Sequence, residues 1–423
     1  MTRRRVSKVV AVLLAVALLA GTPTLVGCGD DGGGGKSTLK VGILTDFTGP
    51  ACFAVRPTLN AFMDCFKLAE ENGEFPADVT VRFVTYDQRT DYSRTPAGYK
   101  WLLGQGVQFM NIISPTDRSI LANNFIDDKM AVTGSSLDEG SPAHEWVYNT
   151  YGSNGHECEV AVQFIIDTWD YEKEGRNPRI GHQSWVLESG VFHQEGFDRM
   201  MAWPEYADKF EFVGWQRAPM GTTQWATEVQ KFMDCDYIFF STVGAMTSSF
   251  IREARNRGYT GALISGTNAF PGYWDMVTEV VPGDQLQNCY FLQWTPWWNA
   301  NVPIIDETKE TIDKWHAGDK EALERNSGPL SGYVMGKFTV EGIKSAIETV
   351  GMENLDGQAI CNAFKALNMD VQGFPEPWRL YKDYYAILRQ MKAFHYSPSI
   401  NNWEPVSDKW YTPLSLADLQ PLQ

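Results

Sequence analysis

The chain has 423 residues, of which 43% are hydrophobic and 21% are charged, so its composition is that of a folded globular protein. This composition excludes a disordered chain and a fibre, and the length favours two or three domains or two large lobes. The formal net charge of −16 argues against nucleic acid as a partner, because phosphate groups require a positively charged surface.

The first 27 residues contain, in order, the segments that export requires. Four basic and no acidic residues occur within residues 1–8, and the apolar run 9–20 follows them. Its twelve residues are too few for a membrane span, which needs about 20, but they suit the core of a signal peptide. We therefore expect residues 1–27 to be a signal peptide.

The residues directly before Cys28, in Leu25-Val26-Gly27-Cys28, resemble the lipobox of bacterial lipoproteins. The resemblance implies cleavage before Cys28 and lipid on its thiol and amine, which would anchor the protein to the outer face of the cell membrane. An ordinary secretory signal with a chance cysteine is the alternative. Removal of residues 1–27 takes the net charge from −16 to −20, so lipid and not electrostatic attraction would hold the protein at an anionic membrane.

Residues 28–38 are rich in glycine and polar side chains, which favours a flexible tether. Their end imitates the phosphate-binding pattern G-x-x-x-x-G-K-[ST]. That pattern requires glycine where Asp30 stands, and it requires a preceding strand, which the sequence does not predict. We therefore expect no nucleotide site in this segment.

From residue 39 onward, short apolar segments alternate with segments of helical periodicity. The expected strands are 40–44, 79–86, 108–113, 131–133, 179–186, 210–216, 237–240 and 262–265. The expected helices are 58–72, 95–105, 119–128, 157–173, 192–210, 223–233, 245–257, 330–350 and 356–367. This order predicts an α/β fold of parallel strands joined by right-handed crossovers.

The alternation divides into two blocks, about residues 39–148 and 157–268. The link between them, 149–155, is polar and contains glycine, so we interpret it as a crossover between two lobes. After Gly373 the chain is rich in proline, tryptophan and tyrosine, and we expect it to return to the lobes as strands and loops.

The expected first strand and its loop, KVGILTDFTGP at residues 40–50, resemble the opening of type I periplasmic binding proteins. More narrowly, they are similar to the leucine/isoleucine/valine-binding family of ABC transporter substrate-binding lipoproteins. Other segments agree in order and spacing with that family, and the resemblance covers about residues 38–367. These segments are Thr85-Tyr86-Asp87, Gly106-Val107-Gln108, Gly221-Thr222-Thr223-Gln224-Trp225 and Asp234-Cys235-Asp236-Tyr237-Ile238.

The resemblance implies an α/β fold of two doubly wound lobes with a hinge, three chain crossings and a ligand cleft between the lobes. We expect residues 39–152 and 288–372 to form the first lobe and residues 153–287 to form the main part of the second. Residues 373–423 would return to the second lobe and add a C-terminal extension.

The same resemblance implies the substrate-binding component of an ABC importer. By hinge closure it would capture a small organic ligand, an amino acid, an amide or an aromatic or other carboxylic acid, and deliver it to a membrane permease with its ATPase. It would be a monomer without a cofactor or metal. A ligand-sensing receptor of the same fold is the alternative. An exported enzyme is a further one, which the lack of a recognisable catalytic motif disfavours.

Hydroxyl groups stand where the first lobe would meet the ligand, because ligands of open α/β sheets bind outside the carboxyl ends of the strands. In family members the loops after the third and fourth strands supply hydroxyls and backbone N–H groups to the ligand carboxylate. Ser135 and Ser136 match one loop, and a helix cap or turn is their alternative role. Ser114 and Ser119 match the other, although Ser114 replaces the glycine of the family's Gly-Pro-x-x-Ser.

Arg56 follows the first strand's loop, where the family usually has small residues. Its guanidinium could bind a carboxylate through two hydrogen bonds. A solvated arginine near Asp46 is the alternative.

On the second lobe, the family often places an aromatic residue and an acid near the ligand. Glu188 is the acid nearest such a loop, and Phe192, Trp225 and Phe270 are aromatic candidates, with Trp185 also available. Core packing is the alternative role for each aromatic side chain. The family's Asp-x-x-Tyr-Gly is replaced here by Glu188-Ser189-Gly190-Val191-Phe192, which argues against the usual recognition of an α-amino acid. It favours a small organic acid or amide with an apolar or aromatic body.

Six cysteines remain beside Cys28. Export to an oxidising compartment makes disulfides possible, and Cys52 with Cys65 is one candidate pair; free buried thiols are the alternative. His156 and Cys158 are two residues apart, but no second pair supports a zinc site.

Overall fold

The computed structural model describes residues 36–422, except 50, 138–140, 142–144, 187 and 268–269. The expected signal peptide and Cys28 therefore lie outside the described residues. Within the part that is described, no helix has both the length and the hydrophobicity that a membrane span requires.

The first lobe is built on a six-stranded sheet, sheet A, whose order is β13-β5-β4-β3-β1-β2. All neighbouring strands in it are parallel. Strands β3, β4, β5 and β13 are buried along their whole length, as expected for a parallel sheet covered on both faces. The strands are β1 (Ser37–Thr45), β2 (Val79–Asp87), β3 (Phe109–Asn111), β4 (Val132–Ser136), β5 (Val147–Tyr151) and β13 (Ala386–Leu388).

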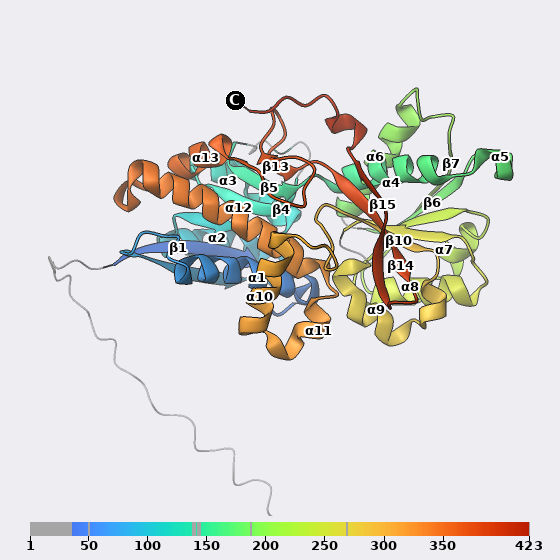
Figure 1. Ribbon diagram of the computed structural model, residues 1–423, viewed down its shortest axis with the longest axis horizontal. Helices are drawn as coiled ribbons and strands as arrows, with labels where there is room; N and C mark the ends of the chain where they lie inside the picture. Colours follow the sequence, from blue (N-terminus) through green and yellow to red (C-terminus); the bar gives the residue numbers. More distant parts are fainter. Residues whose placement is uncertain are drawn as a thin grey trace, which may run out of the picture. The chain divides into compact units, whose positions relative to one another are not determined.

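Helices from both ends of the sequence belong to this lobe, and α12 (orange in Figure 1) packs on α1 (blue). Glycines permit the close packing of α12 on α1. A Cβ at Gly332 would lie 2.0 Å from the Thr58 carbonyl oxygen, and one at Gly336 would lie 2.7 Å from Cys65 Cβ. The helices are α1 (Cys52–Glu71), α2 (Thr95–Gly104), α3 (Pro115–Asp128), α10 (Pro303–Trp315), α11 (Lys320–Leu323), α12 (Ser327–Val350) and α13 (Gly357–Ala366).

The second lobe is built on a seven-stranded sheet, sheet B, whose order is β15-β14-β10-β9-β8-β6-β7. Strands β10, β14 and β15 pair antiparallel, and the remaining pairs are parallel. Its strands are β6 (Arg179–Trp185), β7 (Glu211–Ala218), β8 (Tyr237–Ser241), β9 (Ala262–Ser265), β10 (Cys289–Gln293), β14 (Met391–Ser397) and β15 (Asn402–Tyr411). Its helices are α4 (Asn154–Thr168), α5 (Tyr171–Glu174), α6 (Glu188–Ala202), α7 (Ala226–Lys231), α8 (Ala245–Asn256) and α9 (Trp274–Val280).

Short elements complete the described chain. Two-residue strands β11 (Asn368–Met369) and β12 (Trp378–Arg379) pair antiparallel. The 3-10 turns are η1 (Tyr92–Arg94), η2 (Pro271–Tyr273), η3 (Gly283–Leu286), η4 (Ala317–Asp319), η5 (Met352–Asn354) and η6 (Leu414–Leu416).

The chain passes between the sheets three times: from β5 to α4, from β10 to α10 and from β13 to β14. The lobe boundaries therefore differ from the expected ones. Strand β10 pairs with β9 in sheet B, so the second part of the first lobe begins after residue 293 and not at 288. Strand β13 pairs with β5 in sheet A, so residues 373–423 serve both lobes. Ser37 and Thr38 belong to β1, which shortens the expected tether.

Each expected strand and helix has a counterpart in the structure, and the largest differences are at helix ends. Helix α1 begins at Cys52 although Pro57 lies inside it; the carbonyl that loses its amide partner there belongs to the exposed residue Phe53. The expected helix 157–173 is divided, because the Asp170 side chain accepts a hydrogen bond from the Lys173 amide and starts α5. Strands β5 and β10 and helices α9, α10 and α11 were not predicted.

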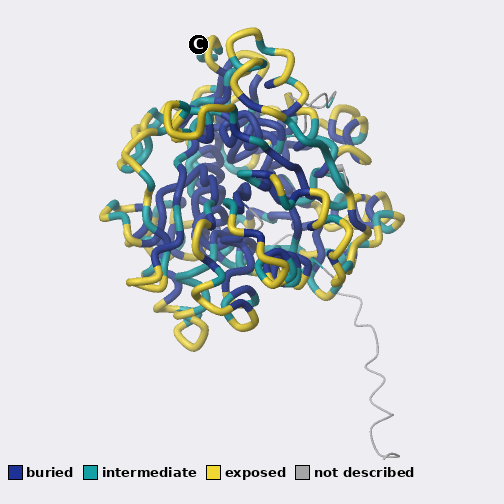
Figure 2. Tube along the Cα trace, turned by 90° about the vertical axis from the view of Figure 1, so that its right-hand side faces the viewer, coloured by how far each residue is buried: buried dark blue, intermediate teal, exposed yellow. Residues whose placement is uncertain are grey.

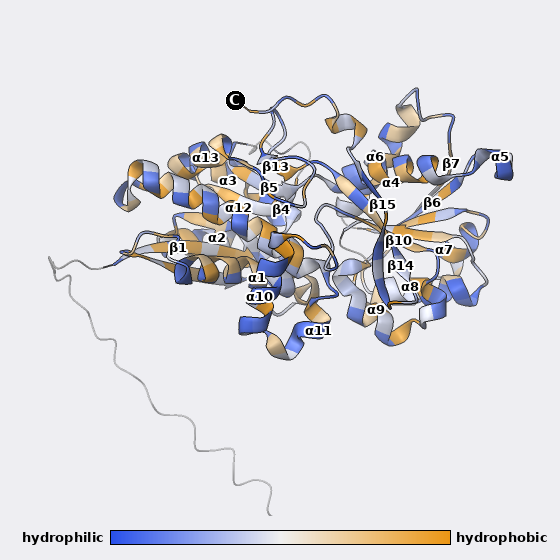
Figure 3. Cartoon of the chain, in the orientation of Figure 1, coloured by the Kyte–Doolittle hydropathy of each residue, from blue (hydrophilic) through white to orange (hydrophobic). Residues whose placement is uncertain are grey.

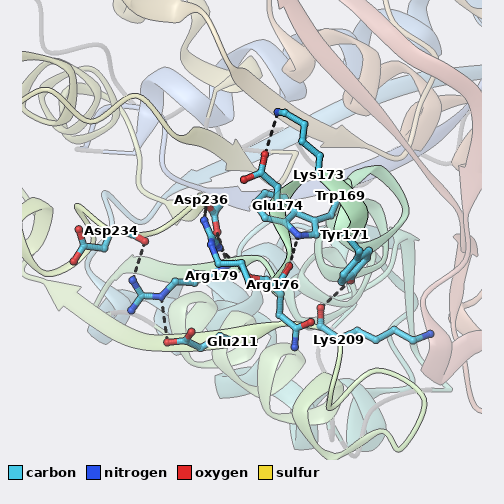
Figure 4. A network of polar contacts seen from close by, with 11 residues as sticks. Trp169, Tyr171, Lys173, Glu174, Arg176, Arg179, Lys209, Glu211, Asp234 and Asp236 are labelled. Atoms are coloured by element: carbon cyan, nitrogen blue, oxygen red, sulfur yellow. Dashed lines mark hydrogen bonds and ion pairs between the residues drawn. The ribbon is translucent and has the colours of Figure 1, made fainter.

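Charged residues tie together the amino ends of three neighbouring strands of sheet B (Figure 4). The Arg176 guanidinium donates two hydrogen bonds, of 2.6 and 2.7 Å, to the Asp236 carboxylate directly before β8. Asp236 also accepts from the Arg179 amide at the start of β6, and the Arg179 side chain pairs with Glu211 at the start of β7. Although burial raises the pKa of Asp236, the hydrogen bonds from Arg176 and Arg179 hold it below its ordinary value. The carboxyl ends of these strands lie at the opposite edge of the sheet, which is the edge available for a ligand site.

Hydrophobic residues occur along the strands of both sheets (Figure 3), and many exposed residues lie in the outer loops (Figure 2). The cysteines in the described chain are free, and all except Cys52 are buried. The candidate disulfide between Cys52 and Cys65 is therefore not formed. Cys65 instead packs at the α1–α12 contact, where burial raises the pKa of its thiol.

Candidate functional site

A cavity of about 240 Å³, called here the inner cavity, lies between the carboxyl ends of the strands of the two sheets. Its lining comes from the residues after β3 and at the end of β4 in the first lobe, and from the ends of β6 and β8 and the residue after β9 in the second. The first turns of α1, α3, α4, α6 and α12 also line it. This is the position that the rule for open α/β sheets predicts for a ligand.

Hydroxyl groups form the first-lobe wall of the inner cavity. Ser114, Ser135 and Ser136 all line it, and Ser135 and Ser136 end strand β4. Ser114 caps helix α3, where its hydroxyl accepts from the Asp117 amide at 3.3 Å. Helix N-termini carry partial positive charge, so this wall suits an anionic group.

A buried arginine holds this wall from behind. One terminal nitrogen of Arg118 donates to the carbonyl oxygens of Ile112 at 2.7 Å and Ile113 at 2.6 Å, and the other donates to the Ser136 carbonyl. The guanidinium occupies space that a side chain at Gly134 would fill, since a Cβ there would lie 2.3 Å from it. Arg118 therefore fixes the ends of β3 and β4 relative to each other.

The neighbouring acid Asp117 is fully buried in the first turn of α3. Burial raises the pKa of this carboxyl, and the hydrogen bonds from Thr95, Ser114 and Gln88 only partly oppose that effect. Asp117 does not belong to the described lining of the inner cavity, so it lies behind the wall that Ser114 forms.

A buried carboxylate and a histidine form the second-lobe wall. Glu157, in the first turn of α4, has one oxygen 3.3 Å from His193 Nε2. Its other oxygen accepts from the Thr267 amide at 3.2 Å and from Trp294 Nε1 at 3.4 Å. Gly266 makes room for this carboxylate, because a Cβ there would lie 1.6 Å from Oε2.

Aromatic side chains line the remaining surface, namely Tyr92, Tyr151, Trp185 and Tyr273. Trp185 Nε1 donates to the Ser189 hydroxyl at 2.7 Å, which fixes the indole at the end of β6. Tyr151, directly before the first crossing, stacks on Trp294 of the second crossing with 5.8 Å between ring centroids. The cavity therefore combines an apolar body with polar groups at two walls.

Hydrogen bonds cross between the lobes beside the cavity. The N-cap residue of α12, Asn326, donates to the Gly272 carbonyl at 2.9 Å. Ser327 donates to the Thr267 carbonyl at 3.1 Å. The start of α12 thereby joins the first lobe to the loop that follows β9.

Two of the residues predicted from the first lobe lie elsewhere. Ser119 is exposed on α3, one turn beyond the lining residues Ser114 to Thr116. Arg56 lines a separate outer cavity of about 310 Å³ and donates to the Phe47 carbonyl at 2.8 Å. Asp46 accepts hydrogen bonds from the Ala51 amide and other loop groups instead.

Among the predicted second-lobe residues, Trp225 and Phe270 lie in the core and do not line the inner cavity. Trp225 follows the edge strand β7, packs edge-to-face on Phe250 and donates to Ser249. Phe270 packs on Phe240 with 4.6 Å between ring centroids, and on Trp403. Phe192 is partly buried on α6 and is not part of the described lining. The side chain of Glu188 lies outside what the structure describes.

Sequence reasoning did not assign Glu157 or His193 to the site. The signal for Glu157 was available, because it stands in the first turn of a helix that directly follows the recognised crossover, residues 149–155. His193 lies four residues after Ser189 on α6, so both face the cavity from one side of the helix. In the part of the chain that the structure describes, no cluster of residues could hold a metal ion.

Comparison with known proteins identifies a family for this chain. The sequence model of a family described as periplasmic binding protein matches residues 38–395. No curated protein sequence matches the chain.

Solved structures resemble the fold at low sequence identity. A branched-chain amino acid ABC transporter protein from Thermus thermophilus with bound valine has a TM-score of 0.75 at 14% identity, over 90% of this chain and 98% of that one. A fatty acid ABC transporter substrate-binding protein from Thermomonospora curvata has a TM-score of 0.75 at 17% identity, over 91% and 96%. A solute-binding protein of an ABC transporter from R. palustris, in complex with 4-hydroxybenzoate, has a TM-score of 0.70 at 14% identity, over 90% and 100%.

Proposed function

Because the chain belongs to the periplasmic binding protein family, we propose that it is the substrate-binding component of an ABC importer. It captures a small organic acid in the inner cavity as the lobes close and delivers it to a membrane permease. The solved structures support this proposal, since those with a named ligand hold or are assigned a small carboxylic acid: valine, a fatty acid and 4-hydroxybenzoate.

The distribution of charge around the inner cavity carries the proposal. Neither lysine nor arginine occurs among its described lining residues. Its first-lobe wall instead offers the hydroxyls of Ser114, Ser135 and Ser136 and the N-terminus of α3. Hydroxyls and helix N-termini bind a carboxylate by hydrogen bonds and partial charge, without a buried cation. The ligand's carboxylate therefore belongs at this wall.

The test compares an acid with its amide by isothermal titration calorimetry. We expect 4-hydroxybenzoate or leucine to bind and the corresponding 4-hydroxybenzamide or leucinamide to bind at least tenfold more weakly, because the neutral amide cannot use the partial charge of α3. Ser136→Ala is expected to weaken the acid and to leave the amide almost unaffected. Equal affinity for acid and amide would contradict the proposed carboxylate site.

We further propose that lipid on Cys28 anchors the exported protein at the outer face of the cell membrane. The support is the segment order before Cys28, a basic start, an apolar run and small residues. Labelled palmitate should be incorporated into the wild-type protein and not into Cys28→Ser, which should appear in the soluble fraction. Unlabelled wild-type protein would contradict the anchor and leave the cavity assignment intact.

A further inference from the structure

Two buried polar atoms on the second-lobe wall have no hydrogen-bond partner within the described chain. They are His193 Nδ1 and Ser241 Oγ, and both residues line the inner cavity. His193 is 4% exposed and Ser241 is 7% exposed, so both residues are buried. Buried polar atoms in folded proteins are almost always paired, which points to a partner that enters the cavity.

The carboxylate of Glu157 fixes which histidine nitrogen carries the proton. A carboxylate oxygen only accepts, so the 3.3 Å contact with Glu157 places a hydrogen on His193 Nε2. The Asn154 side-chain amide, 3.4 Å from Nε2, then turns its oxygen toward that nitrogen. The neutral ring then presents Nδ1 as an acceptor. Glu157 itself already accepts from Thr267, Trp294 and His193, so it is satisfied without a ligand.

The His193 ring is packed against other rings and lies on a helix that is held in place. The His193 ring lies 5.3 Å from Phe239 and 6.1 Å from His182, measured between ring centroids. Helix α6 is also held close to α4, since a Cβ at Gly196 would lie 2.2 Å from the Gly155 carbonyl oxygen. The position of Nδ1 is thus set by the fold before any ligand binds.

We propose that His193 Nδ1 accepts a hydrogen bond from the ligand, so the protein selects organic acids that also carry an N–H or O–H donor. The donor is an amine, amide or hydroxyl group that reaches the second-lobe wall when the carboxylate lies at the first-lobe wall, and Ser241 is positioned to share in its recognition. The inference rests on the proposed function, because it assumes that the carboxylate is held at the first-lobe wall.

The experiment uses matched acids that differ in the donor alone. These are 4-hydroxybenzoate with benzoate, and leucine with 4-methylpentanoate. For at least one pair, the wild-type protein is expected to bind the donor-bearing acid roughly tenfold or more tightly than the acid without a donor. The acid without a donor excludes water from His193 Nδ1 and leaves that nitrogen without a hydrogen bond.

Two variants separate direct recognition from a structural role of His193. In His193→Gln the amide N–H can still reach Glu157, but no acceptor remains at the Nδ1 position. In His193→Asn the side-chain oxygen replaces Nδ1, but the contact with Glu157 is lost. We expect the preference for the donor-bearing acid to fall to about onefold in His193→Gln and to remain in His193→Asn, with melting temperatures reporting any loss of folding.

The outcomes are distinct. A wild-type protein that binds both members of each pair equally overturns the inference and leaves the proposed function standing. A preference that survives in His193→Gln also overturns it, since the donor must then be recognised elsewhere. If no acid of either pair binds, the proposed function fails and the inference fails with it.

Discussion

The imidazole of His182 lies parallel to the indole of Trp215, with 3° between the ring planes and 5.8 Å between the ring centroids. His182 is fully buried in strand β6, and its Nδ1 contacts Gln194 at 3.1 Å. Burial, with a smaller contribution from His193, lowers the pKa of His182 to about 3. A histidine in this setting couples folding to pH.

The folded protein should lose stability in mild acid because of His182. The unfolded chain takes up a proton near the ordinary histidine pKa of about 6.5, whereas the folded protein does so only near pH 3. The stability that neutral His182 contributes is fully present above the histidine pKa of the unfolded chain. It is lost as the pH falls toward the histidine pKa of the folded protein. Between pH 7 and pH 5 the free energy of unfolding should fall by about 2 kcal/mol from this group.

Urea denaturation at a series of pH values checks this expectation. His182→Phe keeps an aromatic ring beside Trp215 and removes the titration. The variant's free energy of unfolding, relative to that of the wild type, should rise by about 2 kcal/mol between pH 7 and pH 5. A constant difference over this range would contradict the assignment to His182.

Gly266 should tolerate no side chain, because its Cβ position lies 1.6 Å from Glu157 Oε2. In Gly266→Ala the carboxylate must move and lose its contact with His193. We expect the free energy of unfolding to fall by about 2 kcal/mol or more, with loss of ligand binding. Gly272→Ala is the matched control from the same cavity, since its Cβ would meet only Ser327 Oγ, at 3.7 Å. Its stability should stay within about 0.5 kcal/mol of the wild type.

The sequence predicted the fold well because its signals are local and repeated. Short apolar strands alternate with helices, and this pattern survives errors of a few residues at any one boundary. Strands β5 and β10 escaped although they are no shorter than β4 and β8; β5 contains Asn149 and Thr150, and both strands adjoin chain crossings. Their membership in a sheet depends on distant partners, β13 and β14, that no local pattern reveals.

The site was predicted less evenly, for a geometric reason. Ser114, Ser135 and Ser136 line the cavity because they follow central strands of sheet A. Trp225 also follows a strand, but β7 is at the edge of sheet B, so its loop packs on Phe250 and away from the cavity. Strand order, which sequence periodicity does not give, therefore decides which strand-end residues meet a ligand.

Arg118 should be required for the first-lobe wall. Arg118→Met fills similar space but leaves the carbonyl oxygens of Ile112, Ile113 and Ser136 without their charged donor. We expect the free energy of unfolding to fall by about 3 kcal/mol or more, because buried acceptors lose their partners. Arg82→Met, at an exposed position on β2, is the control and should change stability by about 0.5 kcal/mol at most. Equal effects of the two substitutions in chemical denaturation would refute this role.

Arg389 should stabilise the third crossing, in which it is the first residue after β13. Its Nε and one terminal nitrogen donate to the two oxygens of Glu376, each at 2.6 Å, and its other terminal nitrogen donates to the Leu416 carbonyl at 3.1 Å. Arg389→Lys keeps the charge and loses this paired geometry, so we expect the free energy of unfolding to fall by about 1 kcal/mol or more.

The control for this substitution is Arg379→Lys. Arg379 makes a long hydrogen bond, of 3.4 Å, to the hydroxyl of Tyr381 and lies over the ring of that residue. A lysine keeps the charge over the ring, so losing the long hydrogen bond should cost little. Urea denaturation of both variants at neutral pH measures the difference. If Arg379→Lys destabilises the protein as much as Arg389→Lys does, the loss comes from replacing any guanidinium in this region and not from the contact with Glu376. If only Arg389→Lys does so, it comes from the two-point contact with Glu376, which a lysine side chain cannot reproduce because an ammonium lacks the planar fork of a guanidinium.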